Sequence, residues 1–286
     1  MGKKTQDRLM KCIAAVGALC LFCVIVFWSV NYDKGTDTTY DIVCLGDSNF
    51  GNYQDETGIA VLLSEKTGKD VLNGAFGGSM MTKRQGMKTE YQSALSMHSL
   101  AIAICNRNFC VQRAAIDTIV RRDNLGYFEK TFDVLSNVDF EQVEILIIEH
   151  GINDYMLGTP IKNGVDLYDT NTFAGTIRTV VDMLRKEYPD LRIILVTPAY
   201  CAPLMADGEL HYCDEYTYGG GYLEDYVNAE LEVAKELGIE IVDIYHGMGV
   251  NSENCNIYLE DTLHLSEYGR KNAADMIANC ILGEAE

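Results

Sequence analysis

Short apolar runs alternate with amphipathic runs through most of this 286-residue chain, and the alternation restricts the folds open to it. Five runs have the length and continuity of strands that are covered on both faces: residues 41–45, 70–73, 144–149, 191–197 and 239–244. A strand followed by a helix, repeated about five times, is typical of a parallel sheet with helices on both sides. The pattern therefore predicts an α/β fold with a parallel sheet of about five strands.

The runs between the strands have the periodicity of helices that bury one face. The clearest begins at Phe173 and continues at residues 177, 180, 181 and 184, with Asn171 or Thr172 available as its cap. Others end at Gly68 and Gly238, and a last one covers residues 273–281. Two segments break the alternation: residues 80–137, which we expect to be a helical excursion, and residues 200–222, which are rich in Tyr, Gly and acidic residues. Loops of this kind at the carboxyl ends of strands usually shape the ligand site.

The N-terminus has a different character from the rest. Four Lys or Arg residues within residues 1–11 precede an uncharged, almost wholly apolar stretch at residues 12–30. About 20 such residues cross a bilayer as a helix, so we expect one transmembrane signal anchor there. The cationic flank predicts that residues 1–11 are cytoplasmic and that, after a linker at residues 31–40, the domain of residues 41–286 lies outside the cell membrane. A cleaved signal peptide is the alternative, but its apolar region would be shorter and would precede a cleavage site of small residues.

Charge limits the partners of the domain. The chain carries a formal charge of −19, and removing the local +3 of residues 1–11 leaves −22 for the remainder. Such a surface repels nucleic acid and anionic headgroups, so we expect no nucleic-acid partner and a neutral or cationic substrate.

Cysteine usage indicates neither a disulfide framework nor a zinc site. Three of the ten cysteines lie in the apolar stretch, and the other seven are irregularly spaced. Cys201 and Cys213 are the pair that could bridge a loop in an oxidising compartment.

Four short motifs carry the chemistry: residues 46–49, 73–79, 151–154 and 261–264. Ser48 directly follows a predicted strand, at the end where a parallel sheet presents its ligands. A serine hydroxyl is a poor nucleophile until an imidazole takes its proton. His264 is the candidate base, and Asp261, three residues earlier, can accept from the other ring nitrogen and hold the tautomer.

An acyl-transfer intermediate also needs hydrogen-bond donors for its oxyanion. The backbone N–H of Ser48, an N–H in the glycine-rich turn at Gly78, and the side-chain amide of Asn153 are the candidates. Glycine leaves room for a close approach of substrate, and Asn donates without carrying charge. Asp47 and Asp154 are more typical of residues that brace loops.

Taken together, the motifs Gly46-Asp47-Ser48, Gly78 after Asn73, Gly151-x-Asn153-Asp154 and Asp261-x-x-His264 resemble the four blocks of the SGNH hydrolases, also called GDSL esterases and lipases. The resemblance covers residues 41–282. It implies a three-layer α/β/α flavodoxin-like fold, with Ser48 as nucleophile, Asp261 and His264 as its partners, and Ser48, Gly78 and Asn153 as the oxyanion hole. Asn49 and His150 depart from the commoner residues of the blocks.

Two other hydrolase classes fit less well. No Gly-x-Ser-x-Gly elbow precedes a helix, which disfavours the α/β-hydrolase fold. A two-metal phosphoesterase needs clustered histidine ligands that the motifs lack, and His211 with Cys213 in a polar loop is a weak metal candidate. We therefore expect neither a metal nor a cofactor.

The sequence thus predicts a membrane-anchored serine esterase that cleaves O-acyl esters, with carbohydrate as the expected acyl carrier, through an acyl-Ser48 intermediate. Anchored relatives resemble enzymes that trim or add acetyl groups on surface polysaccharide. The same groups would serve an O-acyltransferase if a glycan hydroxyl replaced water, with a membrane-bound acyltransferase as partner. A glycan-binding or assembly subunit without catalysis is the third hypothesis, although it would not need Ser, His and Asp together.

Overall fold

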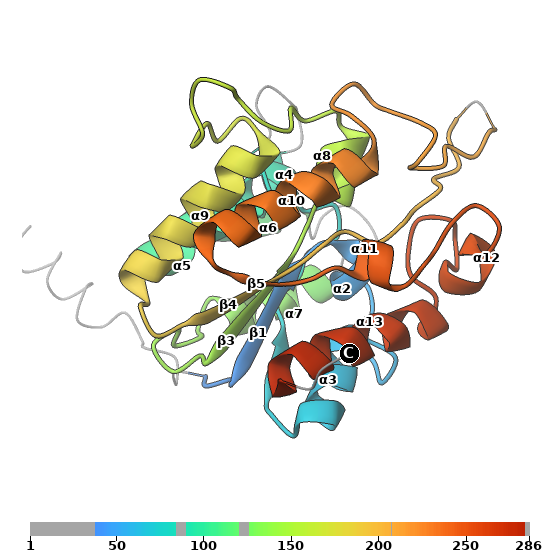
Figure 1. Ribbon diagram of the computed structural model, residues 1–286. Coiled ribbons are helices and arrows are strands. Elements are labelled where there is room, and N and C mark those ends of the chain that lie inside the picture. Colours follow the sequence, from blue (N-terminus) through green and yellow to red (C-terminus); the bar gives the residue numbers. More distant parts are fainter. Residues whose placement is uncertain (1–37, 84–89, 120–125, 207, 284–286) are drawn as a thin grey trace, which may run out of the picture. The chain divides into compact units, whose positions relative to one another are not determined.

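A parallel five-stranded sheet forms the centre of the computed structural model, which describes residues 38–83, 90–119, 126–206 and 208–283 (Figure 1). The strands are β1 (Ile42–Gly46), β2 (Val71–Asn73), β3 (Ile145–Glu149), β4 (Arg192–Val196) and β5 (Glu240–Val242), in the order β2-β1-β3-β4-β5. The predicted α/β fold with a five-stranded parallel sheet is confirmed. The order is that of flavodoxin-like sheets. Strand β2 is added on one side of β1, and β3 to β5 are added on the other, so the strand order reverses between β1 and β3.

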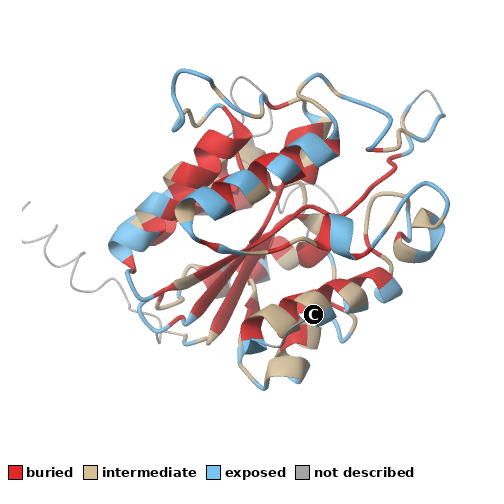
Figure 2. Cartoon of the chain, in the orientation of Figure 1, coloured by how far each residue is buried: buried red, intermediate tan, exposed pale blue. Residues whose placement is uncertain are grey.

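Burial explains why these residues form strands. Every residue of β1 and β3 is buried, and the two strands pair in register from Ile42 with Ile145 to Gly46 with Glu149. Figure 2 shows the strands as a buried layer, with exposed residues on the outer faces of the helices. A parallel strand that is covered on both sides must be apolar throughout. Glu149, at the end of β3, is the exception and belongs to the site described below.

Helices cover both faces of the sheet. α3 (Ile59–Thr67) and α13 (Glu267–Leu282) pack together on one face, and α9 (Phe173–Glu187) contacts both α5 (Met97–Asn106) and α10 (Leu223–Leu237) on the other (Figure 1). The remaining helices are α2 (Ser48–Gly51), α4 (Glu90–Ala94), α6 (Cys110–Ile119), α7 (Gly126–Leu135), α8 (Ile152–Met156), α11 (Ile244–Gly247) and α12 (Cys255–Tyr258).

Local signals set several helix ends. Gly68 and Gly238 terminate α3 and α10 in the left-handed conformation, as their positions predict. Of the two cap candidates for α9, Thr172 is the cap, and its hydroxyl accepts from the N–H of Gly175 at 3.2 Å. α13 begins at Glu267, earlier than its apolar spacing predicts, because Ser266 caps it. The described part of residues 80–137 forms the helices α4 to α7, as expected for a helical excursion.

Residues 1–37 lie outside the described residues. They include the predicted cytoplasmic segment and the predicted membrane anchor at 12–30. Within the part of the chain that the structure describes, no helix combines the length and apolar composition required of a membrane span.

Candidate active site

The site lies where β1 and β3 end side by side. β1 leads through Asp47 into Ser48, the first residue of α2, and β3 leads through His150 and Gly151 into α8, which contains Asn153. Because both strands are parallel and adjacent, their following segments meet at one edge of the sheet. This edge is the reversal point of the sheet, where open α/β folds bind ligands.

Ser48, His264 and Asp261 form a continuous chain of hydrogen bonds. The Oγ of Ser48 lies 2.9 Å from Nε2 of His264, and Nδ1 of His264 lies 2.6 Å from Oδ2 of Asp261. The first contact joins residues that are 216 positions apart in the sequence. The structure therefore brings together the three side chains that the motifs singled out.

The loop of residues 261–264 holds its histidine through the backbone. Oδ1 of Asp261 accepts from the N–H groups of Leu263 at 3.2 Å and His264 at 2.7 Å, which leaves Oδ2 for the imidazole. Thr262 adopts a φ of +70°, which lets the chain turn within this short span. Burial raises the pKa of the Asp261 carboxyl, but hydrogen bonds from the side chain and N–H of His264 outweigh it and lower that pKa overall.

Asn49 connects this loop to the nucleophile. Its side chain is buried, and Oδ1 accepts from the N–H of Leu265 at 2.9 Å, so the residue after Ser48 is bonded to the residue after His264. Asn49 is one of the two departures from the commoner motif residues. Here it joins the segment of Ser48 to the loop of His264.

The glycine turn runs beside Ser48. The N–H of Phe76 donates to the carbonyl of Gly46 at 3.1 Å, and the N–H of Ser79 closes the turn by donating to the carbonyl of Phe76 at 3.0 Å. A Cβ on Gly77 would lie 3.6 Å from Cβ of Ser48. Within the described residues, the backbone N–H groups of Ser48 and Gly78 have no hydrogen-bond acceptor, so both are available to a ligand.

Asn153 reaches the same region, but its amide already has partners. Nδ2 donates to the carbonyl of Ser79 at 3.0 Å and to Oδ2 of Asp47 at 3.2 Å. The second contact joins the segments that follow β3 and β1. To donate to a substrate oxygen, the amide would exchange or share one of these bonds.

Three buried carboxyl groups lie behind these residues. Asp154 accepts from the N–H and hydroxyl of Thr82 and from the N–H of Met81 at 2.7 Å, so it braces the chain that follows the glycine turn. Burial raises the pKa of Asp154 to about 6. Burial likewise raises the pKa of Asp47 to about 6, against the lowering effect of the Asn49 N–H and the charge of His264.

Glu149 is the functional-site residue that sequence reasoning missed. It is fully buried at the end of β3, and Oε2 lies 3.4 Å from the N–H of Asp47. Burial, and then the neighbouring Asp47 carboxylate, raise its pKa well above the ordinary value. The sequence signal was a single acidic residue at the end of an otherwise apolar strand.

His150, the second departure from the motifs, also has a structural partner. Its Nε2 lies 3.0 Å from Oγ of Ser79, which links the end of β3 to the glycine turn. Burial lowers the pKa of His150 to about 3, so the ring is neutral at physiological pH.

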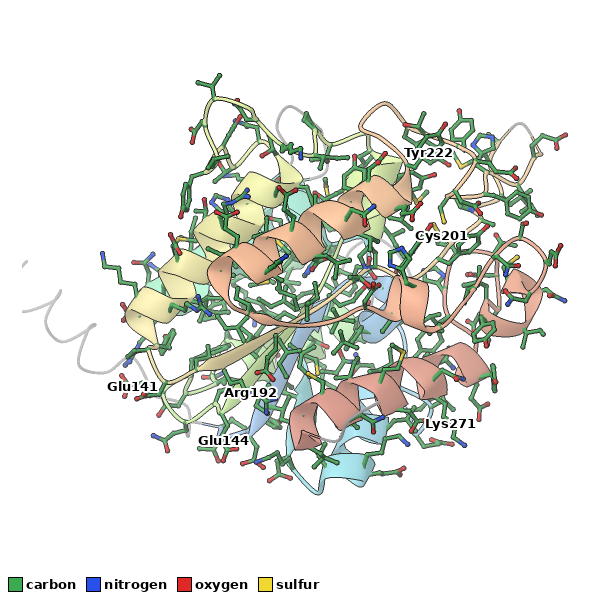
Figure 3. All side chains as sticks on the ribbon, viewed as in Figure 1. Glu141, Glu144, Arg192, Cys201, Tyr222 and Lys271 are labelled. Atoms are coloured by element: carbon green, nitrogen blue, oxygen red, sulfur yellow. The ribbon has the colours of Figure 1, made fainter. Side chains whose placement is uncertain are left out.

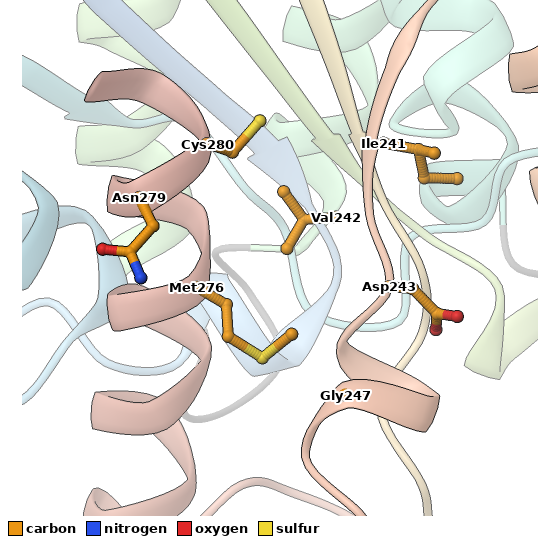
Figure 4. A pocket seen from close by; sticks show the side chains of 7 residues that line it. All are labelled: Ile241, Val242, Asp243, Gly247, Met276, Asn279 and Cys280. Atoms are coloured by element: carbon orange, nitrogen blue, oxygen red, sulfur yellow. The ribbon is translucent and has the colours of Figure 1, made fainter. Parts of the chain in front are cut away.

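A second Asp-x-x-His pair lies outside this constellation. Nδ1 of His246 lies 2.7 Å from Oδ2 of Asp243, but its Nε2 faces Glu224 at 3.3 Å, where His264 faces a serine hydroxyl. Asp243 also borders a pocket of about 410 Å³ between β5 and α13, into which Met276 projects from the helix (Figure 4). None of the residues that line this pocket belongs to the four motifs: Ile241, Val242, Asp243, Gly247, Met276, Asn279 and Cys280.

The loop of residues 200–222 lies beyond the end of β4, where Figure 3 marks Cys201 and Tyr222. The N–H of Ala202 donates to the carbonyl of Thr262 at 2.7 Å, which ties this loop to the His264 loop.

Cys201 and Cys213 are adjacent, buried and free, with the N–H of Cys201 3.4 Å from Sγ of Cys213. The ring of His211 stacks on Tyr216. Among the described residues, no group of His, Cys, Asp and Glu is arranged to hold a metal ion.

Comparisons with known proteins give one family model that matches most of the chain. The model of the family described as GDSL-like lipase/acylhydrolase matches residues 42–277. The isoamyl acetate-hydrolyzing esterase 1 homolog of Mus musculus is 30% identical over 102 residues, which are 35% of this chain and 41% of that protein. The Bos taurus homolog is 30% identical over 101 residues, with the same coverage of 35% and 41%. The chain thus spans about two-fifths of the length of these curated relatives.

Solved structures resemble the fold along nearly their whole length. A Lactobacillus plantarum protein superposes with a TM-score of 0.60 at 16% identity, covering 87% of this chain and 100% of its own. Est24, a carbohydrate acetylesterase from Sinorhizobium meliloti, superposes with a TM-score of 0.52 at 15% identity, covering 85% and 98%. At these identities the likeness concerns the fold alone.

Proposed function

Because the chain belongs to the GDSL-like lipase/acylhydrolase family, whose model matches residues 42–277, we propose that it is a serine esterase with its active site at Ser48. The observation that carries the proposal is the hydrogen-bonded chain from Ser48 Oγ through His264 to Asp261, at 2.9 and 2.6 Å. These are the contacts that general-base activation of a serine requires.

The geometry supports the following roles. His264 Nε2 takes the hydroxyl proton as Ser48 Oγ attacks the ester carbonyl, and Asp261 stabilises the imidazolium through Nδ1. The N–H groups of Ser48 and Gly78, with the amide of Asn153, donate to the oxyanion of the tetrahedral intermediate. His264 then returns the proton to the departing alcohol, which leaves an acyl group on Ser48. Water, deprotonated by His264, releases the acid and restores the serine.

We propose acetylated carbohydrate outside the cell membrane as the substrate class. A charge of −22 on residues 12–286, which follows from −19 for the whole chain and +3 for residues 1–11, disfavours anionic ligands and tolerates neutral sugars. A protein of the same fold, Est24, is described as a carbohydrate acetylesterase. The apolar stretch at residues 12–30, with its cationic flank, supports a membrane anchor and an extracytoplasmic domain at residues 41–286.

Hydrolysis of p-nitrophenyl acetate and of acetylated xylo-oligosaccharides by the full chain tests the proposal. We expect Ser48→Ala to lower kcat/KM on both substrates by roughly 10³-fold or more, because the nucleophile is lost while the fold remains. Ser64→Ala is the matched control, since its hydroxyl donates to the carbonyl of Lys69 outside the site and the variant should keep full activity.

Two results would contradict the proposal in different ways. Equal turnover of both substrates by the wild type and Ser48→Ala would exclude catalysis by Ser48. Ser48-dependent cleavage of p-nitrophenyl acetate without release of acetate from the oligosaccharides would leave the esterase but reject carbohydrate as its substrate.

A further inference from the structure

Helix α7 places a tyrosine hydroxyl between two segments of the site. The hydroxyl of Tyr127 accepts from the N–H of Gly77 at 2.9 Å and donates to Oδ1 of Asn52 at 3.1 Å. Asn52 is the C-cap of α2, the helix that begins with Ser48, and Gly77 belongs to the glycine turn. One hydroxyl group, which can donate and accept at once, therefore links the nucleophile's helix to the turn.

The surroundings of Tyr127 fix its hydroxyl in this position. The next residue, Phe128, is fully buried and packs edge-on against Phe76, with ring centroids 5.3 Å apart. Phe76 is the first residue of the glycine turn, so α7 is packed directly on the segment that its hydroxyl contacts. Burial raises the pKa of Tyr127, and the protonated hydroxyl remains a donor.

Glycines on both sides make room for the hydroxyl. A Cβ on Gly51 would lie 2.9 Å from the Tyr127 oxygen, and one on Gly77 would lie 3.1 Å from it. Both distances are shorter than ordinary contacts between carbon and oxygen. The close approach of Tyr127 is thus built into α2 and into the glycine turn.

The turn needs such an anchor because of its composition. Residues 76–79 form a turn closed by the 3.0 Å bond from Ser79 N–H to Phe76 carbonyl, with Gly78 at a φ of +73°. A positive φ at the third position is typical of a type II turn, in which the peptide between the two central residues is rotated relative to type I. Two consecutive glycines restrain this peptide weakly. That peptide carries the N–H of Gly78.

We propose that Tyr127 is a positioning residue for the oxyanion hole: by holding the N–H of Gly77 against α2, it keeps the N–H of Gly78 directed at the tetrahedral intermediate formed on Ser48. This inference rests on the proposed function. It assigns a catalytic consequence to the helical excursion of residues 80–137, which none of the four motifs includes.

Replacement of Tyr127 by Phe removes the hydroxyl and keeps the ring. For p-nitrophenyl acetate we expect kcat to fall about 10-fold, less than for loss of an oxyanion donor itself, and KM to stay within about twofold. A boronic acid that forms a tetrahedral adduct with Ser48 places one of its oxygens in the oxyanion position, so its inhibition constant should weaken by about the same 10-fold factor.

Two further variants separate positioning from general structure. Tyr188→Phe is the matched control, because the Tyr188 hydroxyl is buried and donates to the carbonyl of Ile104 at 3.0 Å, away from the four motifs. It should change the melting temperature but neither kcat nor the boronate inhibition constant. Asn52→Ala removes the other partner of the hydroxyl, and its effect should be non-additive with Tyr127→Phe.

The outcomes distinguish this inference from the proposed function. Turnover that depends on Ser48 but is unchanged in Tyr127→Phe would overturn the role of Tyr127 and leave the esterase intact. A loss confined to KM, with unchanged boronate inhibition, would also overturn it, as would an equal loss of kcat in Tyr188→Phe. Absence of Ser48-dependent turnover in the wild type would overturn both.

Discussion

The side-chain amide of Asn153 stabilises the site before any substrate arrives. Its two contacts, at 3.0 Å to the Ser79 carbonyl and 3.2 Å to Asp47, join the ends of β1 and β3 to the glycine turn. To donate to a substrate oxyanion, the amide would displace or share one of these two contacts. Asn153 therefore has a structural contribution and, in our proposal, a catalytic one.

We expect Asn153→Ala to lower kcat by roughly 10²-fold, as for loss of one oxyanion donor, with a smaller change in KM. Steady-state kinetics on p-nitrophenyl acetate measure both constants, and thermal unfolding reports the structural part. Asn163→Ala is the control, since Nδ2 of Asn163 donates to Asp169 within a loop that contains none of the four motifs. A fall in kcat no larger than in this control would remove Asn153 from the oxyanion hole.

Individual residues show how far sequence spacing can identify a site. An Asp three residues before a His occurs at Asp261 and again at Asp243, and both pairs are hydrogen-bonded, at 2.6 and 2.7 Å. Only the context of the other motifs favoured the first pair, and only folding brings its imidazole to Ser48. Glu149 had a local signal, a lone acid at the end of an apolar strand, but its approach to Asp47 depends on the pairing of β3 with β1. Tyr127 had none, because its contacts with Gly77 and Asn52 join distant segments that no local pattern records.

At the scale of elements, helix α10 contains an unpartnered acid on its buried face. Glu230 is fully buried beside Val233 and Ala234, and neither of its carboxylate oxygens has a hydrogen-bond partner within the described residues. Burial, and then the charges of Asp243 and Asp154, raise its pKa well above the ordinary 4.5. The folded state thus holds this proton more tightly than the unfolded chain does.

The sign of the pH effect follows from this difference. Protonated Glu230 contributes fully to stability below about pH 4.5, and the contribution is lost as pH rises from 4.5 through the higher folded-state pKa. Glu230→Gln cannot ionise, so we expect its free energy of unfolding to exceed that of the wild type by about 1 kcal/mol or more at pH 8, and to differ little at pH 4. Urea unfolding at several pH values between these limits measures the difference.

The control for this prediction lies on the same helix. Glu232 is exposed and faces Lys162 at 3.5 Å, so Glu232→Gln should show no such dependence on pH. Asp47, Asp154 and Glu149 also have raised pKa values and remain in both proteins, so only the difference between variant and wild type is informative. A constant difference from pH 4 to pH 8 would contradict an ionising Glu230.

Elements were predictable where their burial is uniform or periodic. β1, β3 and β4 lie within one or two residues of their predicted bounds because each is apolar and covered on both faces. β5 is shorter than predicted, since residues after Val242 turn into α11. The packing of helices in the excursion could not be predicted, because α6 contacts α4 and α7, and α7 contacts the glycine turn, with no strand between them to set their order in space.

For the whole molecule, charge and hydropathy divide the chain into two unlike parts. Residues 1–11 carry a local +3 and precede the apolar stretch at 12–30, whereas the rest contributes −22 to the total of −19. For the membrane anchor that we propose, the positive-inside rule predicts a cytoplasmic cationic flank and an outer domain, on the strength of the Lys and Arg residues within residues 1–11. The proposed orientation therefore depends on the cationic flank and not on the acidity of the domain.

We expect the chain to remain with membranes after alkaline extraction, and Leu21→Arg combined with Ile25→Arg to release it, since two charges in the middle of an apolar span cost roughly 5–7 kcal/mol. Leu21→Val with Ile25→Leu is the matched control and should stay bound.

Orientation can be read from Cys110, which is exposed on the domain. In intact cells a membrane-impermeant maleimide should label the wild type and label Cys110→Ser less. Labelling only after lysis would place the domain inside, and the acetylated surface glycans proposed as substrates would then be out of reach of Ser48.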